Sequence, residues 1–174
     1  LLQLVGNNGT ETTISFSFPD AEYHNVYQPV FVKVDADGNI SSAVRATVDW
    51  NPVDNPASSY TWGISDGFSL YGAAQDANGN FFVTGNLRRT MHIGENEILA
   101  HNVADWDGGS GFAGSAFVLK LNSDLTYNSH IVTGGSSVGE TAKQMKYKDG
   151  KLYIAGYLKG TNAVVSLGDS QVTP

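Results

Sequence analysis

Residues 81–87 read Phe-Phe-Val-Thr-Gly-Asn-Leu, and the same pattern returns at residues 152–158 as Leu-Tyr-Ile-Ala-Gly-Tyr-Leu. The central glycines, Gly85 and Gly156, lie 156 − 85 = 71 positions apart. A similar segment precedes each copy, at residues 70–80 and 141–151. Each segment, together with the copy that follows it, is predicted to form a strand, a tight turn and a second strand. The pairs Asn78-Gly79 and Asp149-Gly150 at these turns are typical of two-residue hairpin loops with positive φ. A fixed order of recurring short strands predicts a repeat architecture.

A second hairpin also occurs twice. Residues 30–39 (Val-Phe-Val-Lys-Val-Asp-Ala-Asp-Gly-Asn) match residues 117–126 (Phe-Val-Leu-Lys-Leu-Asn-Ser-Asp-Leu-Thr), with an offset of 117 − 30 = 87. A third, shorter block places Val5, Ile93 and Leu167, each followed by glycine, at the same point in the order. The offsets differ because loops differ in length, and surface loops accept insertions at small entropic cost.

The repeating unit is therefore four short antiparallel strands with a long connection inside it. Such units are typical of β-propeller blades. No run of ten or more residues shows helical periodicity, so the predicted fold class is all-β. We expect residues 1–174 to form a single partial β-propeller with repeat units at about 4–92 and 93–174.

The chain is expected to begin and end in the middle of a blade, so its strands come from three successive blades. We expect the outer two strands of one blade, all four of the next, and the inner two of a third. Repeats bury their apolar faces against neighbours, so two blades alone leave two unpaired faces. Neighbouring blades are expected from a longer chain or from other subunits.

The composition excludes several classes of function. The chain has a net charge of −7, and its few basic residues form no continuous face, so nucleic acid is not an expected partner. The absence of cysteine excludes disulfides and thiolate metal sites. The printed sequence contains no membrane-spanning stretch and no signal-peptide pattern.

These residues resemble a known repeat. The strand at residues 116–124, the Val132-Thr133-Gly134-Gly135 turn, and the hairpins ending in Gly85 and Gly156 are similar to the seven-bladed β-propeller repeat called SBBP. The resemblance covers about two thirds of the chain and fails over residues 10–27 and 51–59. It implies a secreted or surface-exposed bacterial protein, often a lipoprotein of the Bacteroides type, and no shared catalytic residues.

The sequence predicts no catalytic residue, cofactor or metal. Nucleophile elbows, phosphate loops and zinc-protease motifs are missing. The run Asp35-Ala36-Asp37-Gly38-Asn39 begins like a calcium loop, but the twelfth position, which should be a bidentate Glu, is Ala46. We favour a hairpin turn in which Asp and Asn side chains cap the backbone. The four histidines are dispersed, and no pair has metal-ligating spacing.

Aromatic and acidic residues in two divergent segments are the candidate binding residues. The first group flanks a Pro-rich insertion and consists of Trp50, Tyr60, Trp62 and Tyr71. The second group lies in the long connection and consists of Asp105, Trp106 and Asp107. Aromatic rings beside polar groups suit a glycan or peptide. The alternative, which we favour, is that these rings pack in the core or between blades. Any ligand contact is expected at residues 51–62 or 101–111.

The sequence is compatible with three alternative functions. The leading hypothesis is a non-enzymatic binding or scaffold module, extracellular or on a bacterial surface, with a neutral glycan or peptide as ligand. The second is a carbohydrate-active propeller enzyme whose carboxylates come from several blades. The third is a purely structural repeat.

Overall fold

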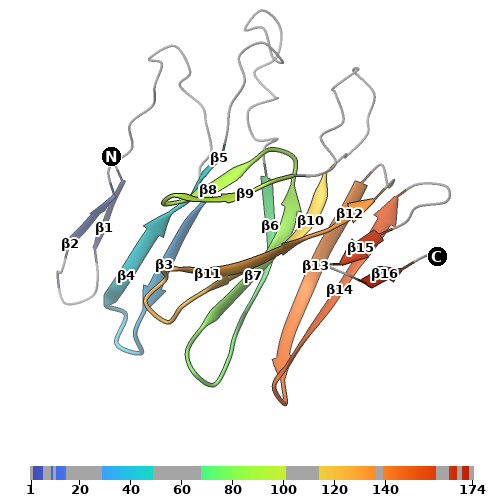
Figure 1. Cartoon of the computed structure of the whole chain (residues 1–174). Helices are drawn as coiled ribbons and strands as arrows, with labels where there is room; N and C mark the ends of the chain where they lie inside the picture. Colours follow the sequence, from blue (N-terminus) through green and yellow to red (C-terminus); the bar gives the residue numbers. More distant parts are fainter. Residues whose placement is uncertain are drawn as a thin grey trace, which may run out of the picture.

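The chain is all-β. The computed structural model describes residues 2–5, 9, 11–14, 29–48, 68–100, 114–135, 139–159, 165–167 and 170–172, and none of these residues is helical. Figure 1 shows antiparallel hairpins standing in a row, with a central sheet between them. Within the described part of the chain, no helix is long and apolar enough to cross a membrane.

The central sheet contains the four-stranded unit that the repeat predicts. Its strands are β6 (Phe68–Gln75), β7 (Phe81–Leu87), β10 (Ser115–Leu121) and β11 (Tyr127–Val132). They lie in the order β11-β10-β7-β6, and every neighbouring pair is antiparallel. The two hairpins of the unit thus pair through β7 and β10, although 27 residues (115 − 87 − 1) separate these strands in sequence.

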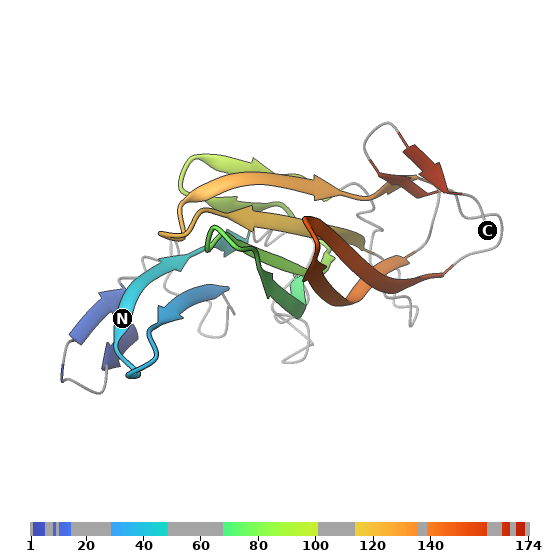
Figure 2. The same ribbon diagram turned by 90° about the horizontal axis from the view of Figure 1, so that it is seen from below.

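Two further hairpins flank the central sheet (Figure 2). They are β3 (Val30–Val34) with β4 (Ile40–Arg45), and β13 (Gly139–Lys148) with β14 (Lys151–Lys159). In sequence, β3–β4 matches β10–β11, and we call these two the outer hairpins. Likewise β13–β14 matches β6–β7, and we call these two the inner hairpins. The row therefore holds an outer hairpin, a complete four-stranded sheet and an inner hairpin, which is the predicted strand order.

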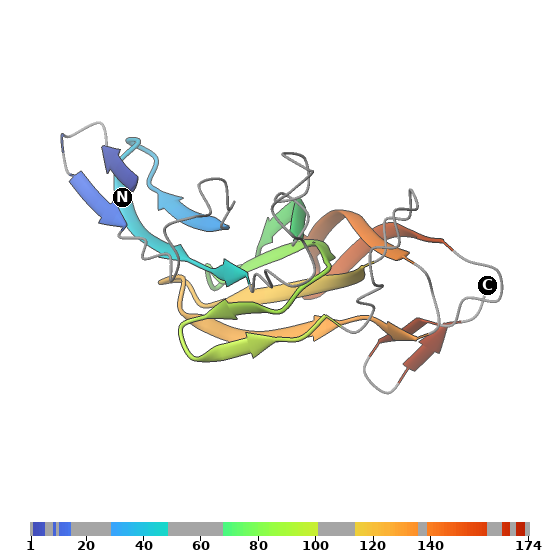
Figure 3. The same ribbon diagram turned by 90° about the horizontal axis from the view of Figure 1, so that it is seen from above.

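Three small hairpins occupy the third repeated block. They are β1 (Leu2–Val5) with β2 (Glu11–Ile14), β8 (Met91–Ile93) with β9 (Asn96–Ile98), and β15 (Val165–Leu167) with β16 (Ser170–Val172). Two of them pair with a short strand that follows an earlier hairpin: β5 (Thr47–Val48), which follows β3–β4, pairs with β8, and β12 (Gly134–Gly135), which follows β10–β11, pairs with β15. Figure 3 shows these small sheets along the same row. These pairs link β3–β4 to the segment after β6–β7, and β10–β11 to the segment after β13–β14.

Each face of the central sheet contacts a neighbouring element, and the inner strands β7 and β10 are the most buried. Side chains alternate along β10, so that Phe117, Leu119 and Leu121 join a buried apolar cluster that also contacts Phe31 and Val44 of β3–β4. The hairpin β3–β4 makes its apolar contact with this face of the central sheet.

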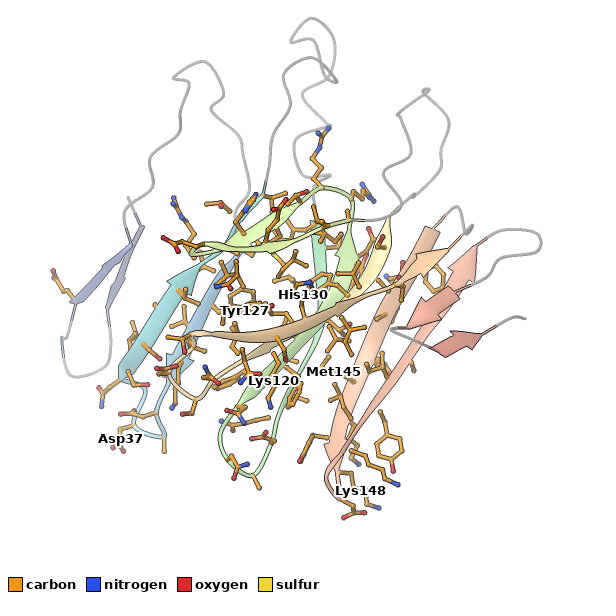
Figure 4. All side chains as sticks on the ribbon, in the orientation of Figure 1. Asp37, Lys120, Tyr127, His130, Met145 and Lys148 are labelled. Atoms are coloured by element: carbon orange, nitrogen blue, oxygen red, sulfur yellow. The ribbon has the colours of Figure 1, made fainter. Side chains whose placement is uncertain are left out.

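The opposite face meets the hairpin β13–β14. The Phe82 ring stacks on Tyr147 with 5.9 Å between centroids, and the Lys120 ammonium lies 5.6 Å from the Phe82 centroid. Lys120 and Met145 are labelled on this side in Figure 4. A Cβ atom on Gly72 would lie 3.3 Å from the backbone nitrogen of Met145, so glycine lets β6 and β13 approach closely.

The two inner turns differ from each other, which corrects one expectation. Asp149 and Gly150 have φ values of 51° and 75° and form the predicted two-residue loop. The Asn78-Gly79 turn is longer: Gly79 donates to the Asp76 carbonyl at 3.0 Å, and only Gly79 of this loop has positive φ, 82°. This is a type I turn followed by a left-handed residue.

The longer turn shifts the alignment of the first strand. Gln75 pairs with Phe81, and Tyr147 pairs with Leu152. The second strands keep the offset of 152 − 81 = 71, whereas the first strands match at 147 − 75 = 72. The outer hairpins keep one offset throughout, because the pairs Val34–Ile40 and Leu121–Tyr127 both differ by 87.

Leu125 occupies the left-handed position that glycine holds in the matching turn. Its φ is 70°, close to the 83° of Gly38. This conformation costs a side-chain-bearing residue about 1–2 kcal/mol. The Leu125 side chain is buried in the apolar cluster, and this burial offsets the cost.

We expect Gly150→Val to lower the free energy of unfolding by about 1 kcal/mol or more, because a β-branched residue is strained at positive φ. Apart from its two chain neighbours, no atom of the described residues lies within 4 Å of the Cβ position, so the expected loss comes from backbone strain. Gly150→Asn is the control and should retain most of the stability, since Asn tolerates this conformation. Urea denaturation measures both, and equal stability of the Val variant and the parent would contradict the turn assignment.

Candidate functional site

The six candidate residues named from the sequence lie outside the described residues. They fall within residues 49–67 and 101–113; they are Trp50, Tyr60, Trp62, Asp105, Trp106 and Asp107. Tyr71, which the sequence grouped with the first three, lies on β6 and is described.

The glycine in the repeated strand faces a bulge in the strand beside it. Leu70 pairs with Gly85 and Gly72 pairs with Thr84, so Tyr71 is an extra residue in β6. A Cβ atom on Gly85 would overlap the carbonyl oxygen of Ser69. The bulge therefore requires a residue without a side chain at position 85.

The second copy repeats this arrangement. Ala142 pairs with Gly156 and Gln144 pairs with Ala155, so Lys143 is the extra residue in β13. A Cβ atom on Gly156 would overlap the carbonyl oxygen of Thr141. The most recognisable glycine of the repeat thus marks a bulge in each inner hairpin, and bulges often redirect side chains at functional sites.

The two bulge residues meet. The Lys143 ammonium lies 3.5 Å from the centroid of the Tyr71 ring and 5.7 Å from that of Tyr157 on β14. We call these three residues the tyrosine–lysine cluster. One ring comes from the central sheet, and the other two residues come from the next repeat, so the cluster forms only where two repeats pack together.

The cluster is open to solvent. Tyr71 is 42% exposed and Tyr157 is 52% exposed. Partial burial alone would raise the pKa of the Tyr71 hydroxyl, but its hydrogen bond with Ser69 and the positive charge of Lys143 bring this pKa below its ordinary value. The ammonium and the two rings hold one another in place by cation–π attraction.

The chemistry of the cluster suits recognition. Two exposed rings offer flat apolar faces, and their hydroxyls and the ammonium offer hydrogen bonds at the edges. Tyrosine gives a large contact area at low entropic cost, which is why it is common at binding surfaces. No carboxylate belongs to the cluster, so it has no pair of acids for glycoside hydrolysis.

The Asp35 run forms a turn, as the sequence reasoning favoured. The Asp35 Oδ1 atom accepts hydrogen bonds from the backbone nitrogens of Asp37 and Asn39, at 2.9 and 2.8 Å, and Oδ2 accepts from the Asn39 side chain. Asp76 makes the same three contacts with Asn78 and Asn80. These carboxylates serve the turn backbone.

Hydrogen bonding keeps the turn carboxylates ionised. The backbone bond from Asn39 lowers the pKa of Asp35, the side chain of Asn80 lowers the pKa of Asp76, and the Thr126 hydroxyl lowers the pKa of Asp124. Among the described residues, no group of three or more His, Asp or Glu side chains is placed to hold a metal ion.

Two of the four histidines are described, and they lie on different strands. The Tyr127 hydroxyl lies 2.8 Å from the Nδ1 atom of His130, both on β11 (Figure 4). His92 lies on β8. His24 and His101 fall outside the described residues.

Comparison with protein-family models, with curated proteins and with solved structures gives no match. The resemblance to the SBBP repeat therefore stays a prediction from the residues alone.

We expect Gly156→Ala to lower the free energy of unfolding by about 1–3 kcal/mol, because the new methyl group must displace the Thr141 carbonyl and with it the bulge. The effect should exceed that of Gly150→Ala, where the surroundings are open and only backbone strain is added. Chemical denaturation of the two variants gives the comparison. Equal or smaller loss at position 156 would show that the bulge tolerates a side chain.

The turn carboxylates predict acid sensitivity. Their folded pKa values lie below the unfolded values, so their contribution to stability is complete above the unfolded pKa of about 3.9 and is lost as pH falls through the folded pKa. Thermal melts from about pH 6 to pH 2.5 should show this loss. In Asp76→Asn the amide oxygen can still accept the backbone bonds, so the pH dependence should be shallower. An unchanged pH profile would contradict the role of Asp76.

Proposed function

We propose that this chain is a non-enzymatic binding or scaffold module built from β-propeller-type repeats, and that it recognises a neutral glycan or a peptide. The observation that carries this proposal is the tyrosine–lysine cluster, in which two half-exposed rings and an ammonium converge from adjacent repeats.

The arrangement of strands supports the propeller-type architecture. A four-stranded antiparallel meander stands between the hairpins β3–β4 and β13–β14, and the short strand pairs β5–β8 and β12–β15 link successive hairpins. Propellers place four-stranded sheets side by side in this way and use the loops and strand ends for recognition.

The charges favour a neutral ligand. The chain carries a net charge of −7, which repels polyanions at long range. The Lys143 ammonium lies against the two rings, so it can supply a local hydrogen bond without making the surface basic. A sugar with a flat apolar face, or a peptide with an aromatic or proline ring, matches this combination.

A binding role also agrees with the state of the turn carboxylates. A glycosidase acid needs a raised pKa, so Asp35, Asp76 and Asp124, whose pKa values are lowered, do not suit that role. The resemblance to the SBBP repeat implies an extracellular or bacterial cell-surface location and a lipoprotein character.

Glycan and peptide arrays probed with the intact protein test the proposal. For a ligand found in this way, Tyr157→Ala should weaken binding by about tenfold or more, because an exposed recognition ring is removed with little effect on packing. Tyr157→Phe is the matched control that keeps the ring. Trp62→Ala and Trp106→Ala test the two loops named from the sequence.

The outcomes separate the alternatives. Loss of affinity in Tyr157→Ala at an unchanged melting temperature supports the cluster as the site. Loss in the tryptophan variants alone would move the site to the loops. A lower melting temperature with unchanged affinity would assign the cluster to packing between repeats.

A further inference from the structure

The strands β7 and β14 have the same sequence pattern but different surroundings. β7 pairs with β6 on one edge and with β10 on the other. Within the described residues, β14 pairs only with β13. The consequence appears at equivalent positions, because Val83 is 7% exposed whereas Ile154, 71 positions later, is 44% exposed. The β14 edge therefore lacks the partner that its copy in the central sheet has.

The strands β3 and β10 form the complementary case. β10 pairs with β11 and with β7, whereas β3 pairs only with β4 among the described strands. Leu121 is fully buried, but Val34, its equivalent 87 positions earlier, is 53% exposed. The β3 edge lacks a strand of the β7 type, and β14 is such a strand.

The two open edges do not pair within one copy, because β3 and β14 lie on opposite sides of the central sheet (Figures 1 and 3). We propose that β14 of one copy of this chain pairs with β3 of a second copy, so that the inner hairpin β13–β14 and the outer hairpin β3–β4 together make a four-stranded sheet like the central one. This inference concerns assembly and is independent of the proposed ligand.

The central sheet gives the register of the proposed pair. Phe117 pairs with Gly85, Leu119 with Val83, and Leu121 with Phe81. Transferring these pairs by −87 on one strand and +71 on the other places Val30 opposite Gly156, Val32 opposite Ile154, and Val34 opposite Leu152. The exposed apolar side chains of both strands then meet.

Side-chain chemistry agrees with this register. The same transfer places Lys33 opposite Tyr153, as Lys120 lies opposite Phe82 and over its ring. Continuing by one residue places Asp35 opposite Lys151, an attractive pair where the central sheet has Asn122 and Asn80. This charge complementarity between two parts of the same chain favours a second copy as the partner.

The small hairpins impose one constraint on the joint. Both β15–β16 and β1–β2 repeat β8–β9, so the completed sheet would bring two such hairpins to one place. β15 pairs with β12, whereas β1–β2 pairs with no third strand in the described part of the chain. We therefore expect β15–β16 to keep its position and β1–β2 to be displaced on association.

The contact is head to tail, so it produces a closed ring or an open filament. Each copy contributes, in its described part, one complete four-stranded sheet and two half-sheets to this contact.

Cysteine cross-linking tests the pair, since the chain has no cysteine of its own. Chains carrying only Val32→Cys are mixed with chains carrying only Ile154→Cys under mild oxidation. Directly opposite residues are close enough for a disulfide. The control mixes Val32→Cys with Ala155→Cys, because a shift of one residue moves the side chain to the other face of the sheet. Circular dichroism and melting temperature check that all three variants fold like the parent.

We expect the in-register mixture to form at least about tenfold more disulfide-linked dimer than the control. Native mass spectrometry of the parent should show species larger than 18.5 kDa at protein concentrations of about 100 µM. A folded parent that stays monomeric, or equal cross-linking at positions 154 and 155, would overturn the proposal. A monomer that still binds a ligand would refute the assembly and leave the proposed function intact.

Discussion

The inner hairpins depend on a backbone contact that a side chain would prevent. At Gly85 and Gly156 the carbonyl oxygen of the bulged neighbouring strand lies where a Cβ atom would be. Because the bulge can form, one residue in each first strand is redirected, and these residues are Tyr71 and Lys143. The candidate binding cluster follows from this feature, since Tyr71 and Lys143 are the bulge residues that meet in it.

A second constraint is that the faces and edges of one repeat are completed by the next. The inner strands β7 and β10 of the central sheet are largely buried, because the small sheet β5–β8–β9 and the hairpin β3–β4 pack on one face and β13–β14 packs on the other. The same sequence pattern is exposed where this cover or an edge partner is missing, as at Ile154 and Val34. Exposure therefore depends on position in the row, and an isolated repeat would leave much of its apolar surface in water.

The turns show how different residues satisfy one backbone geometry. Asp35 and Asp76 each accept two backbone N–H bonds and one side-chain bond, and a glycine in the left-handed region completes these turns. In the matching turn of β10–β11, Asn122 begins the loop, Asp124 bonds Thr126, and Leu125 takes the left-handed position. Leucine is tolerated there because the apolar cluster binds its side chain. Degeneracy in the repeat is thus compensated by packing.

The sequence by itself determined the all-β class, the hairpins and their order, because strand alternation and turn residues act over a few positions. It also determined the positive φ of Gly79 and Gly150. It did not determine the length of the Asn78-Gly79 turn, since the hydrogen bonds of Asp76 favour a longer loop there. The sequence also did not explain why positions 85 and 156 must be glycine, because the carbonyl oxygens that exclude a Cβ atom there belong to the paired strand. Only the tertiary structure brought Tyr71 to Lys143, 143 − 71 = 72 residues apart, because their meeting depends on two bulges and on the packing of two repeats.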